Sequence, residues 1–170
     1  MTDETLVAIG EDYPELRDSV RKICAGYPGT YWSALEDKEA YPTEFVDELT
    51  KAGFLGALIP EEYGGSGLPV RAAAVILEEI NASGCVASQG HAQMYIMGTL
   101  LRYGSEAQKK EYLPQIASGK LRLQAFGVTE PTTGSDTTQL KTRAVRDGDS
   151  YIINGQKVWT SFAKTADYGL

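Results

Sequence analysis

Apolar residues in the first two thirds of the chain recur every three or four positions, which is the spacing of one face of an α-helix. In the first such segment, Leu16, Val20 and Ile23 share a face. Glycine and proline residues separate the segments, and Ser105 with Gln108 forms a capping-box pattern at the start of the last one. The pattern predicts five helices, at residues 14–25, 41–53, 70–83, 86–103 and 105–119.

Two of these predicted helices carry more specific expectations. In 70–83, Glu78 and Glu79 are expected on the side opposite the apolar residues. In 86–103, the stretch 94–101 is apolar nearly all round, which is typical of a helix buried on every side. The five helices together are enough for a helical domain with its own core.

From Leu121 onward the apolar spacing moves towards two, which is typical of β-strands. Asp147-Gly-Asp-Ser150 separates two strand-like runs, and Asp-Gly in such a position predicts a hairpin turn. Strands are therefore expected within 121–128, at 140–145, at 151–153 and at 157–161, with another one beginning at 168–170.

The change of period predicts an α+β fold with segregated domains. Residues 1–120 would form an all-α helical domain, and residues 121–170 the beginning of an antiparallel β-domain. A few strands cannot bury both faces of a sheet. We therefore expect this second domain to be incomplete.

Gly65-Ser-Gly-Leu-Pro-Val70 contains a Gly-x-Gly pair that invites comparison with a dinucleotide-binding loop. The third glycine is absent, and Pro60-Glu-Glu follows the only possible preceding strand. A Rossmann loop requires strand, turn and helix in immediate succession. The stretch therefore predicts a structural turn between helices.

Composition excludes several classes of partner. Sixteen basic against 23 acidic residues give a net charge of −7, which disfavours a nucleic-acid backbone. No apolar run approaches the ~18 residues of a membrane span, and the start of the sequence lacks the order of a signal peptide. Cys24 and Cys85 lie in apolar helical contexts, so we expect two buried thiols and a cytoplasmic protein.

The segment Phe126–Asp136 concentrates polar groups at the junction of the helical and strand-like regions. It holds threonines, a serine, glycine and two carboxylates within eleven residues. Glycine lets a backbone approach a ligand closely, and hydroxyl and N–H groups can hold a phosphate. For this loop alone, a solvated turn is the preferred interpretation.

Four motifs occur in order along the chain: Ile59–Gly65 (IPEEYGG), Tyr103–Leu113 (YGSEAQKKEYL), Val128–Asp136 (VTEPTTGSD) and Asn154–Ser161 (NGQKVWTS). This set resembles the FAD-dependent acyl-CoA dehydrogenases over nearly the whole chain. The resemblance implies desaturation of an acyl-CoA thioester between Cα and Cβ, with FAD as the cofactor. Members of that family are considerably longer, so we expect this chain to be the N-terminal portion of such an enzyme.

The resemblance also implies cofactor contacts in the first polar loop. Phe126, Val128 and Thr129 would face the flavin, the last two along its pyrimidine edge, with Thr129 as a hydrogen-bond donor. Gly134 and Ser135 would hold the FAD pyrophosphate through close backbone approach. Ser135 would also lie near the substrate.

A second group of cofactor contacts is implied at the end of the last motif. Trp159 would pack against the isoalloxazine, with Thr160 beside it, and Ser161 would place a hydroxyl near flavin N5. The chain departs from the family pattern at Thr133 and Gln139, where small residues are usual. Thr133 puts the loop geometry in question, and Gln139 is expected to face solvent.

Three polar residues allow more than one interpretation. Glu130 is a tempting catalytic base, but we expect it to anchor the loop, because the family's base is a glutamate in a C-terminal domain. Asp136 is expected to be a turn or cap residue. His91, the single histidine, is either a structural helix residue or, by resemblance, part of the lining of the acyl pocket. No second histidine or cysteine pair lies at metal-ligand spacing, so no metal is expected.

Three functions remain open at this point. The preferred one is an acyl-CoA dehydrogenase that passes electrons to an electron-transferring flavoprotein and forms a dimer or tetramer. The second is an oxygen-using acyl-CoA oxidase or flavin monooxygenase of the same fold. The third is a domain without activity of its own that assembles with a partner chain. The type of acyl group is not readable from the sequence.

Overall fold

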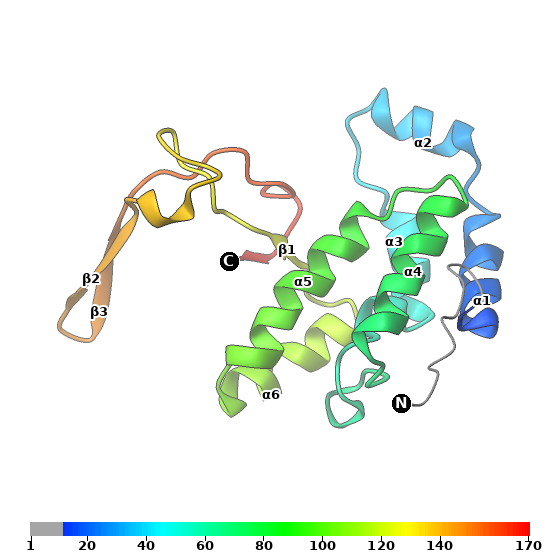
Figure 1. Cartoon of the computed structure of the whole chain (residues 1–170), viewed down its shortest axis with the longest axis horizontal. Helices are drawn as coiled ribbons and strands as arrows, with labels where there is room; N and C mark the ends of the chain where they lie inside the picture. Colours follow the sequence, from blue (N-terminus) through cyan, green and yellow to red (C-terminus); the bar gives the residue numbers. More distant parts are fainter. Residues whose placement is uncertain (1–11) are drawn as a thin grey trace, which may run out of the picture.

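A computed structural model describes residues 12–170, in which six α-helices precede four short strands (Figure 1). None of the described helices is long and apolar enough to cross a membrane. The helices are α1 (Pro14–Cys24), α2 (Gly29–Glu36), α3 (Thr43–Lys51), α4 (Val70–Ala82), α5 (Ser88–Tyr103) and α6 (Glu106–Ala117). Short 3-10 turns lie at η1 (Phe54–Gly56), η2 (Glu61–Tyr63) and η3 (Thr137–Gln139).

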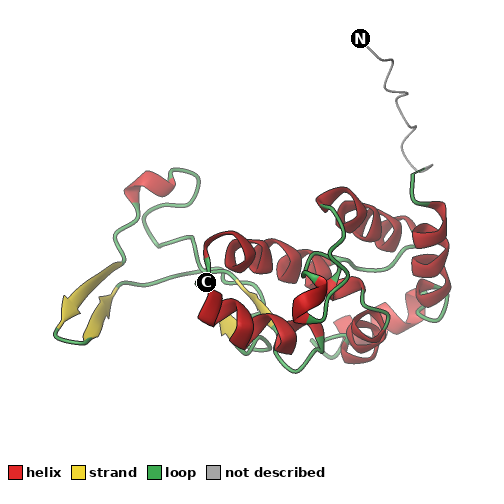
Figure 2. Ribbon diagram, turned by 90° about the horizontal axis from the view of Figure 1, so that it is seen from below, coloured by secondary structure: helices red, strands yellow, loops and turns green. Residues whose placement is uncertain are grey.

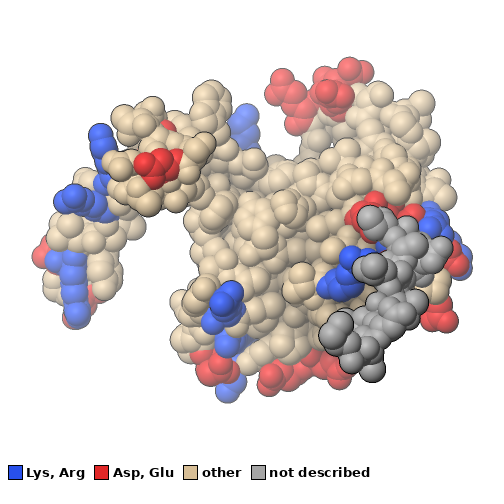
Figure 3. All heavy atoms as spheres, viewed as in Figure 1, with Lys and Arg blue, Asp and Glu red and all other residues tan. Residues whose placement is uncertain are grey.

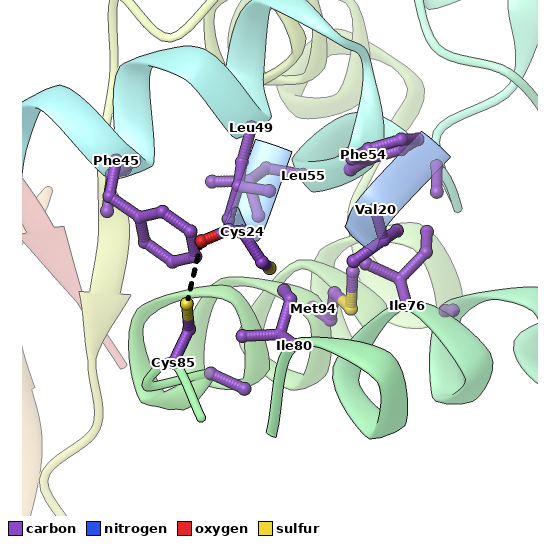
Figure 4. Packing of buried hydrophobic residues seen from close by; sticks show 14 residues of the cluster. Val20, Cys24, Phe45, Leu49, Phe54, Leu55, Ile76, Ile80, Cys85 and Met94 are labelled. Atoms are coloured by element: carbon purple, nitrogen blue, oxygen red, sulfur yellow. Dashed lines mark hydrogen bonds between the residues drawn. The ribbon is translucent and has the colours of Figure 1, made fainter. Parts of the chain in front are cut away.

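The first hydrophobic cluster joins α1, α3 and α4, as the helical spacing predicted. Val20 of α1 is fully buried, and it packs in the same cluster as Phe45 of α3 and Ile76 and Ile80 of α4 (Figure 4). Each of these helices presents one apolar stripe to the others, which is how helices of this length are stabilised in water. The predicted bounds of these helices agree with the structure to within two residues.

A second cluster joins α5, α6 and the first strand. Ile96 and Met97 of α5 pack with Leu113 and Ile116 of α6 and with Leu123. At the start of α6, the Ser105 hydroxyl accepts from the N–H of the residue three positions on, which confirms the capping box. The first strand is thereby held directly on the helical part of the molecule.

The expectation for Glu79 is wrong, because this carboxylate faces α1 instead of solvent. It is 5% exposed and pairs with Arg17 at 3.2 Å and with Arg21 at 2.7 Å. Burial by itself would raise the pKa of Glu79, but Arg21 and Arg17 outweigh that effect and hold the pKa below its usual value. A buried carboxylate of this kind leaves no signature in helical periodicity.

Two further expectations about helices need correction. Helix α5 is not buried on all sides, since Tyr95 is 39% exposed and Thr99 also faces outward. Helix α2 was not predicted, because Pro28 and Gly29 suggested an end rather than a beginning. None of its residues is fully buried, and the two that pack against the first cluster, Tyr31 and Trp32, are adjacent in sequence, so it lacks the spaced apolar stripe that reveals the other helices.

The Gly65–Val70 stretch forms a turn between η2 and α4, and no strand occurs between residues 55 and 81. A β-carbon at Gly65 would overlap the Ile59 backbone, so glycine is required there by packing. Gly67 has φ +58°, which favours glycine for a different reason. Both roles are structural, which confirms the rejection of a dinucleotide-binding loop.

The two thiols are buried and free, as predicted. Although Cys24 and Cys85 lie far apart in sequence, the Cys85 Sγ is 3.7 Å from the carbonyl oxygen of Cys24 (Figure 4). Burial, with a contribution from Cys85, raises the pKa of the Cys24 thiol to about 12. Both side chains therefore pack as small apolar groups, and the Cys24 thiol is not a reactive thiolate at neutral pH.

The strands form two separate pairs. β2 (Arg143–Asp147) and β3 (Ser150–Asn154) make the predicted antiparallel hairpin, whereas β1 (Leu123–Ala125) pairs with β4 (Tyr168–Gly169) in parallel. The fold class is confirmed, but the parallel pair departs from the expected antiparallel arrangement. The strand expected at 157–161 does not form.

The hairpin of β2 and β3 projects away from the helices at the end of two long connections, and we call it the arm (Figure 2). Both of its faces are exposed, including Val145 at 58% and Ile153 at 71%. Lysine and arginine side chains are prominent on this arm, while acidic groups gather at the edges of the helical part (Figure 3). An arm of two strands has no core of its own, so its conformation depends on the segments that anchor it.

Candidate functional site

The two polar segments singled out in the sequence lie side by side in the structure, at the base of the arm. The segment 126–129 leaves β1, and the N–H of Val158 donates to the carbonyl of Thr129 at 2.9 Å. The N–H of Gly127 donates to the carbonyl of Leu170 at 2.7 Å, which fixes the other side of the same segment. Residues about thirty positions apart thus lie side by side. We call the two segments, 126–136 and 157–161, the wall.

Glu130 holds this wall together. Its carboxylate accepts hydrogen bonds from the N–H of Lys141 at 2.7 Å, the N–H of Thr142 at 3.0 Å and the Lys157 Nζ at 2.9 Å. Its side chain is only 4% exposed. One carboxylate therefore ties together the loop, the start of the arm and the segment that returns from it.

These donors lower the pKa of Glu130 to about 2. The causes are the Thr142 hydroxyl, the N–H groups of Lys141 and Thr142, and the Lys157 ammonium. The Thr142 hydroxyl makes no hydrogen bond within the described residues, so the two N–H groups and the ammonium are the donors that bond to the carboxylate. Such a weakly basic, fully engaged carboxylate is unsuited to proton abstraction, and the interpretation of Glu130 as a loop anchor is confirmed.

The loop between these segments is a tight turn stabilised by its own polar groups. The N–H and carbonyl groups of Glu130 and Thr133 bond reciprocally at 2.9 and 3.1 Å. The Thr133 hydroxyl donates to the carbonyl of Asp136 at 2.7 Å, so the unusual threonine is accommodated. Asp136 caps η3 by accepting from the N–H of Thr138 at 3.2 Å, which confirms its role as a cap residue. Gln139 faces solvent, as expected.

The wall presents backbone donors that the described part of the chain leaves unused. Among residues 12–170, no acceptor is bonded to the N–H groups of Val128, Thr129, Gly134, Ser135 or Ser161. The neighbouring N–H groups of Gly127 and Val158 are bonded, whereas those of Thr132, Asp136 and Lys157 also have no acceptor within residues 12–170, so the free donors include the expected cofactor contacts together with some of their neighbours. Consecutive free N–H groups are suited to the oxygens of a phosphate or of a flavin ring.

Gly134 lies against Thr129, where an added β-carbon would sit 3.6 Å from the Thr129 Cγ2. That is ordinary van der Waals contact, so Gly134 is not required by packing inside the chain. A glycine that packing does not require is consistent with close approach of a ligand to the backbone.

Trp159 is the most exposed large side chain of the wall. It is 88% exposed and has φ +60°, a left-handed conformation that costs energy for a bulky residue. Phe162 has the same feature at φ +58°. The N–H groups of Trp159 and Thr160 have no acceptor within the described chain either. A strained backbone that displays an indole to solvent indicates a contact surface.

A row of aromatic side chains extends from the wall along α5. The rings of Phe126 and Tyr95 meet edge-on with their centroids 5.4 Å apart. The centroids of the Tyr95 and His91 rings are 5.1 Å apart. Phe126 is 42% exposed and His91 lies on the exposed side of the helix. The structure thus connects His91 to the candidate site through Tyr95, which the sequence analysis had not singled out.

Lys157 is a further residue to which the sequence analysis assigned no role. Its Nζ donates to the Val128 carbonyl at 3.0 Å as well as to Glu130.

A chain of side-chain hydrogen bonds also supports β1: the Tyr41 hydroxyl donates to Gln124 at 2.8 Å, and Gln124 donates to Gln93 at 3.4 Å. A glutamine within an otherwise apolar strand was the signal that could have revealed this chain.

Comparison with known proteins identifies the family of the chain. Residues 10–120 match the model of the acyl-CoA dehydrogenase N-terminal domain, and residues 125–170 match that of the middle domain. Over 162 residues, the chain is 38% identical to acyl-CoA dehydrogenase FadE12 of Mycobacterium tuberculosis, covering 95% of this chain and 41% of the relative. The chain thus spans about two fifths of the length of such curated relatives.

Solved structures give the same result. An acyl-CoA dehydrogenase from Geobacillus kaustophilus superposes with a TM-score of 0.82 at 31% identity, over 92% of this chain and 41% of that one. A chain from a structure of the electron transferring flavoprotein of Acidaminococcus fermentans has a TM-score of 0.82 at 30% identity, over 99% of this chain and 44% of that one. FAD is the cofactor of the matched family. The protein belongs to the acyl-CoA dehydrogenase family.

Proposed function

We propose that this chain supplies the N-terminal part of the FAD and substrate site of an enzyme that desaturates an acyl-CoA thioester between Cα and Cβ. One observation carries the proposal: two segments distant in sequence form a single wall, and the N–H groups that it leaves unused include those at the expected flavin contacts. In this proposal, residues 1–120 form the helical domain and residues 121–170 the beginning of the β-domain.

The chain's own residues would bind and orient the cofactor. Val128 and Thr129 would donate to the edge of the flavin, and Gly134 and Ser135 would hold the pyrophosphate through their backbone N–H groups. When bound, FAD supplies the hydride acceptor of the reaction. A donor aimed at the flavin edge stabilises negative charge that develops there.

The segment after Lys157 would complete this wall. Trp159 would cover a face of the flavin with its exposed indole, with Thr160 beside it. Ser161 is exposed and would place its hydroxyl near the flavin. Phe126 would close the wall on the side of α5, where its ring meets Tyr95.

The substrate would lie along the exposed side of α5. The row of Phe126, Tyr95 and His91 leads from the wall along this helix, so a bound acyl group would contact aromatic rings and a single imidazole. Ser135 would lie at the opposite end, beside the pyrophosphate.

The catalytic base belongs elsewhere in this proposal. Glu130 is fully engaged and has a pKa of about 2, so it would not take the α-proton. By resemblance, the base is a glutamate of a domain that follows the two matched here. The electron acceptor would be an electron-transferring flavoprotein, and the enzyme would be a homo-oligomer.

The direct test is uptake of FAD by the purified 170-residue chain. We expect quenching of flavin and tryptophan fluorescence, and loss of that quenching in the Trp159→Ala variant. Trp32 offers a matched control, since it packs against the helical core and not in the wall. The proposal is wrong if no FAD is taken up, or if Trp32→Ala and Trp159→Ala reduce uptake equally.

The oxygen-using oxidase and the partner-dependent domain remain as alternatives. Rapid reoxidation of the reduced flavin by air would favour an oxidase over a dehydrogenase. FAD uptake that appears only when a second polypeptide is added would favour the partner-dependent domain.

A further inference from the structure

We propose that Lys157 is a positioning residue that fixes and polarises the Val128–Thr129 peptide, so that the Thr129 N–H is presented as a strengthened donor at the flavin edge. This inference rests on the proposed function, because it takes the flavin to lie against Thr129. It adds a role for a lysine that touches neither cofactor nor substrate in that proposal.

The position of the ammonium is defined from two sides. The Lys157 Nζ lies 3.0 Å from the Val128 carbonyl oxygen and 2.9 Å from the Glu130 Oε1. The side chain is 29% exposed. Its stem crosses Gly127, where an added β-carbon would sit 3.4 Å from the Lys157 Cγ. Packing and pairing together therefore leave the ammonium little freedom.

The Val128 carbonyl and the Thr129 N–H belong to the same peptide unit. A cation bonded to the carbonyl oxygen draws electron density away from the amide, which makes its N–H a better donor. That N–H has no acceptor within residues 12–170, so its bond is available to a ligand. The carbonyl of Thr129 is held in turn by the N–H of Val158 at 2.9 Å. Thr129 is thus fixed on both sides.

Glu130 limits the range of this effect. Because the Glu130 carboxylate is paired with the Lys157 ammonium, the two charges nearly cancel at a distance. The ammonium therefore acts mainly on the peptide that it contacts. A free surface lysine would instead attract anions generally, and its influence would fall with added salt. The expected influence of Lys157 is local and insensitive to salt.

The first test needs no cofactor. The amide proton of Thr129 is followed by nuclear magnetic resonance in the 170-residue chain, which is compared with the Lys157→Met, Lys157→Arg and Lys164→Met variants. We expect an upfield shift of this resonance in Lys157→Met, recovery in Lys157→Arg, and no change in Lys164→Met, where an exposed lysine is removed. Helical circular dichroism should be the same in all four proteins.

The second test separates tuning from a purely structural role. FAD affinity is measured for the oxidised and the two-electron-reduced cofactor. We expect Lys157→Met to weaken binding of reduced FAD about tenfold more than binding of oxidised FAD, a shift of ~30 mV in the two-electron potential. Glu130→Gln leaves the Lys157–Val128 bond possible and should shift the ratio less.

Each outcome decides the question. An unmoved Thr129 resonance in Lys157→Met, or equal losses of affinity for oxidised and reduced FAD, would overturn the inference. Lys157 would then have only a structural role. Equal effects of Lys157→Met and Lys164→Met would overturn it as well. If the wild-type chain takes up no FAD, the proposed function fails, whereas the Thr129 resonance still reports whether Lys157 polarises the peptide.

Discussion

At the scale of single residues, the groups around a side chain decide its role more than its chemical type does. Glu130 lies inside a motif expected to face flavin, and a carboxylate there could be a base. Instead, two backbone N–H groups and one ammonium donate hydrogen bonds to its oxygens. The same carboxylate with free oxygens would have a different function.

The depressed pKa of Glu130 predicts a pH dependence of the wall. Stability gained from the ionised carboxylate is present above the ordinary pKa of 4.5 and is lost as the pH falls towards about 2. We expect the amide protons of Lys141 and Thr142 to lose protection from exchange in that window. In Glu130→Gln the protection should be lower throughout and independent of pH; a wild-type transition near 4.5 would contradict the buried, paired state.

The wall hydroxyls give a second prediction at this scale. Thr129→Ala and Ser161→Ala should each weaken FAD binding by about 0.5–1.5 kcal/mol, the net worth of one hydrogen bond. Thr132→Ala is a matched control, because Thr132 lies in the same loop and is exposed. Titration of flavin fluorescence measures all three. Identical affinities across the set would mean that the wall does not face the flavin.

At the scale of elements, a buried ionic network joins helices that hydrophobic pattern alone would only bring near each other. Arg17 of α1 is 2% exposed and pairs with Glu79 at 3.2 Å and Glu78 at 2.9 Å of α4. Such pairs require a defined geometry, because a buried charge without an opposite charge beside it destabilises the fold. They select one rotation of α1 against α4.

Removing Arg17 should therefore be costly. Arg17→Met leaves Glu79 buried with only Arg21, and we expect a loss of about 3 kcal/mol in the free energy of unfolding. Lys22→Met on an exposed position of the same helix should change it by less than ~0.5 kcal/mol. Urea unfolding followed by helical circular dichroism gives both values. Equal stabilities would show that the network is not important for the fold.

At the scale of the whole molecule, the helical part is well packed and the arm is not. Val145 and Ile152 lie opposite each other in the hairpin and are 58% and 52% exposed. Tyr151 and Ile153 of the same hairpin are 63% and 71% exposed. A hairpin with apolar residues on both faces and open edges invites pairing with another strand.

We accordingly expect the 170-residue chain to self-associate through the arm. Ile153→Lys should shift the equilibrium towards monomer by placing a charge on one face, whereas Asp149→Lys in the turn should not. Sedimentation velocity over a range of concentrations measures both. A wild-type chain that stays monomeric would show that the exposed arm does not drive association.

A second expectation at this scale concerns catalysis. Given FAD and a panel of acyl-CoA thioesters without oxygen, the chain should not bleach the flavin. Glu130, the carboxylate of the wall, is engaged by three donors, and loss of a positioned base costs ~10²–10⁴ in rate. Substrate-dependent bleaching would contradict this and would return Glu130 to consideration as the base.

Much of the architecture could be predicted because it depends on neighbouring residues. Five of the helices, the hairpin and the capping box at Ser105 follow from periodicity and turn chemistry, which act over a few positions. The site segments were found by resemblance of ordered motifs. Helix α2 was missed because it lacks the apolar stripe on which such predictions depend.

Only the tertiary structure decided which distant groups meet. The sequence by itself determined local conformation, since 3.6- and 2-residue periods arise from backbone geometry. It did not determine that Glu79 turns inward to Arg17 or that β1 pairs in parallel with β4. Nor did it show Lys157 between Val128 and Glu130. These contacts depend on long-range packing, which places groups together at no fixed spacing along the chain.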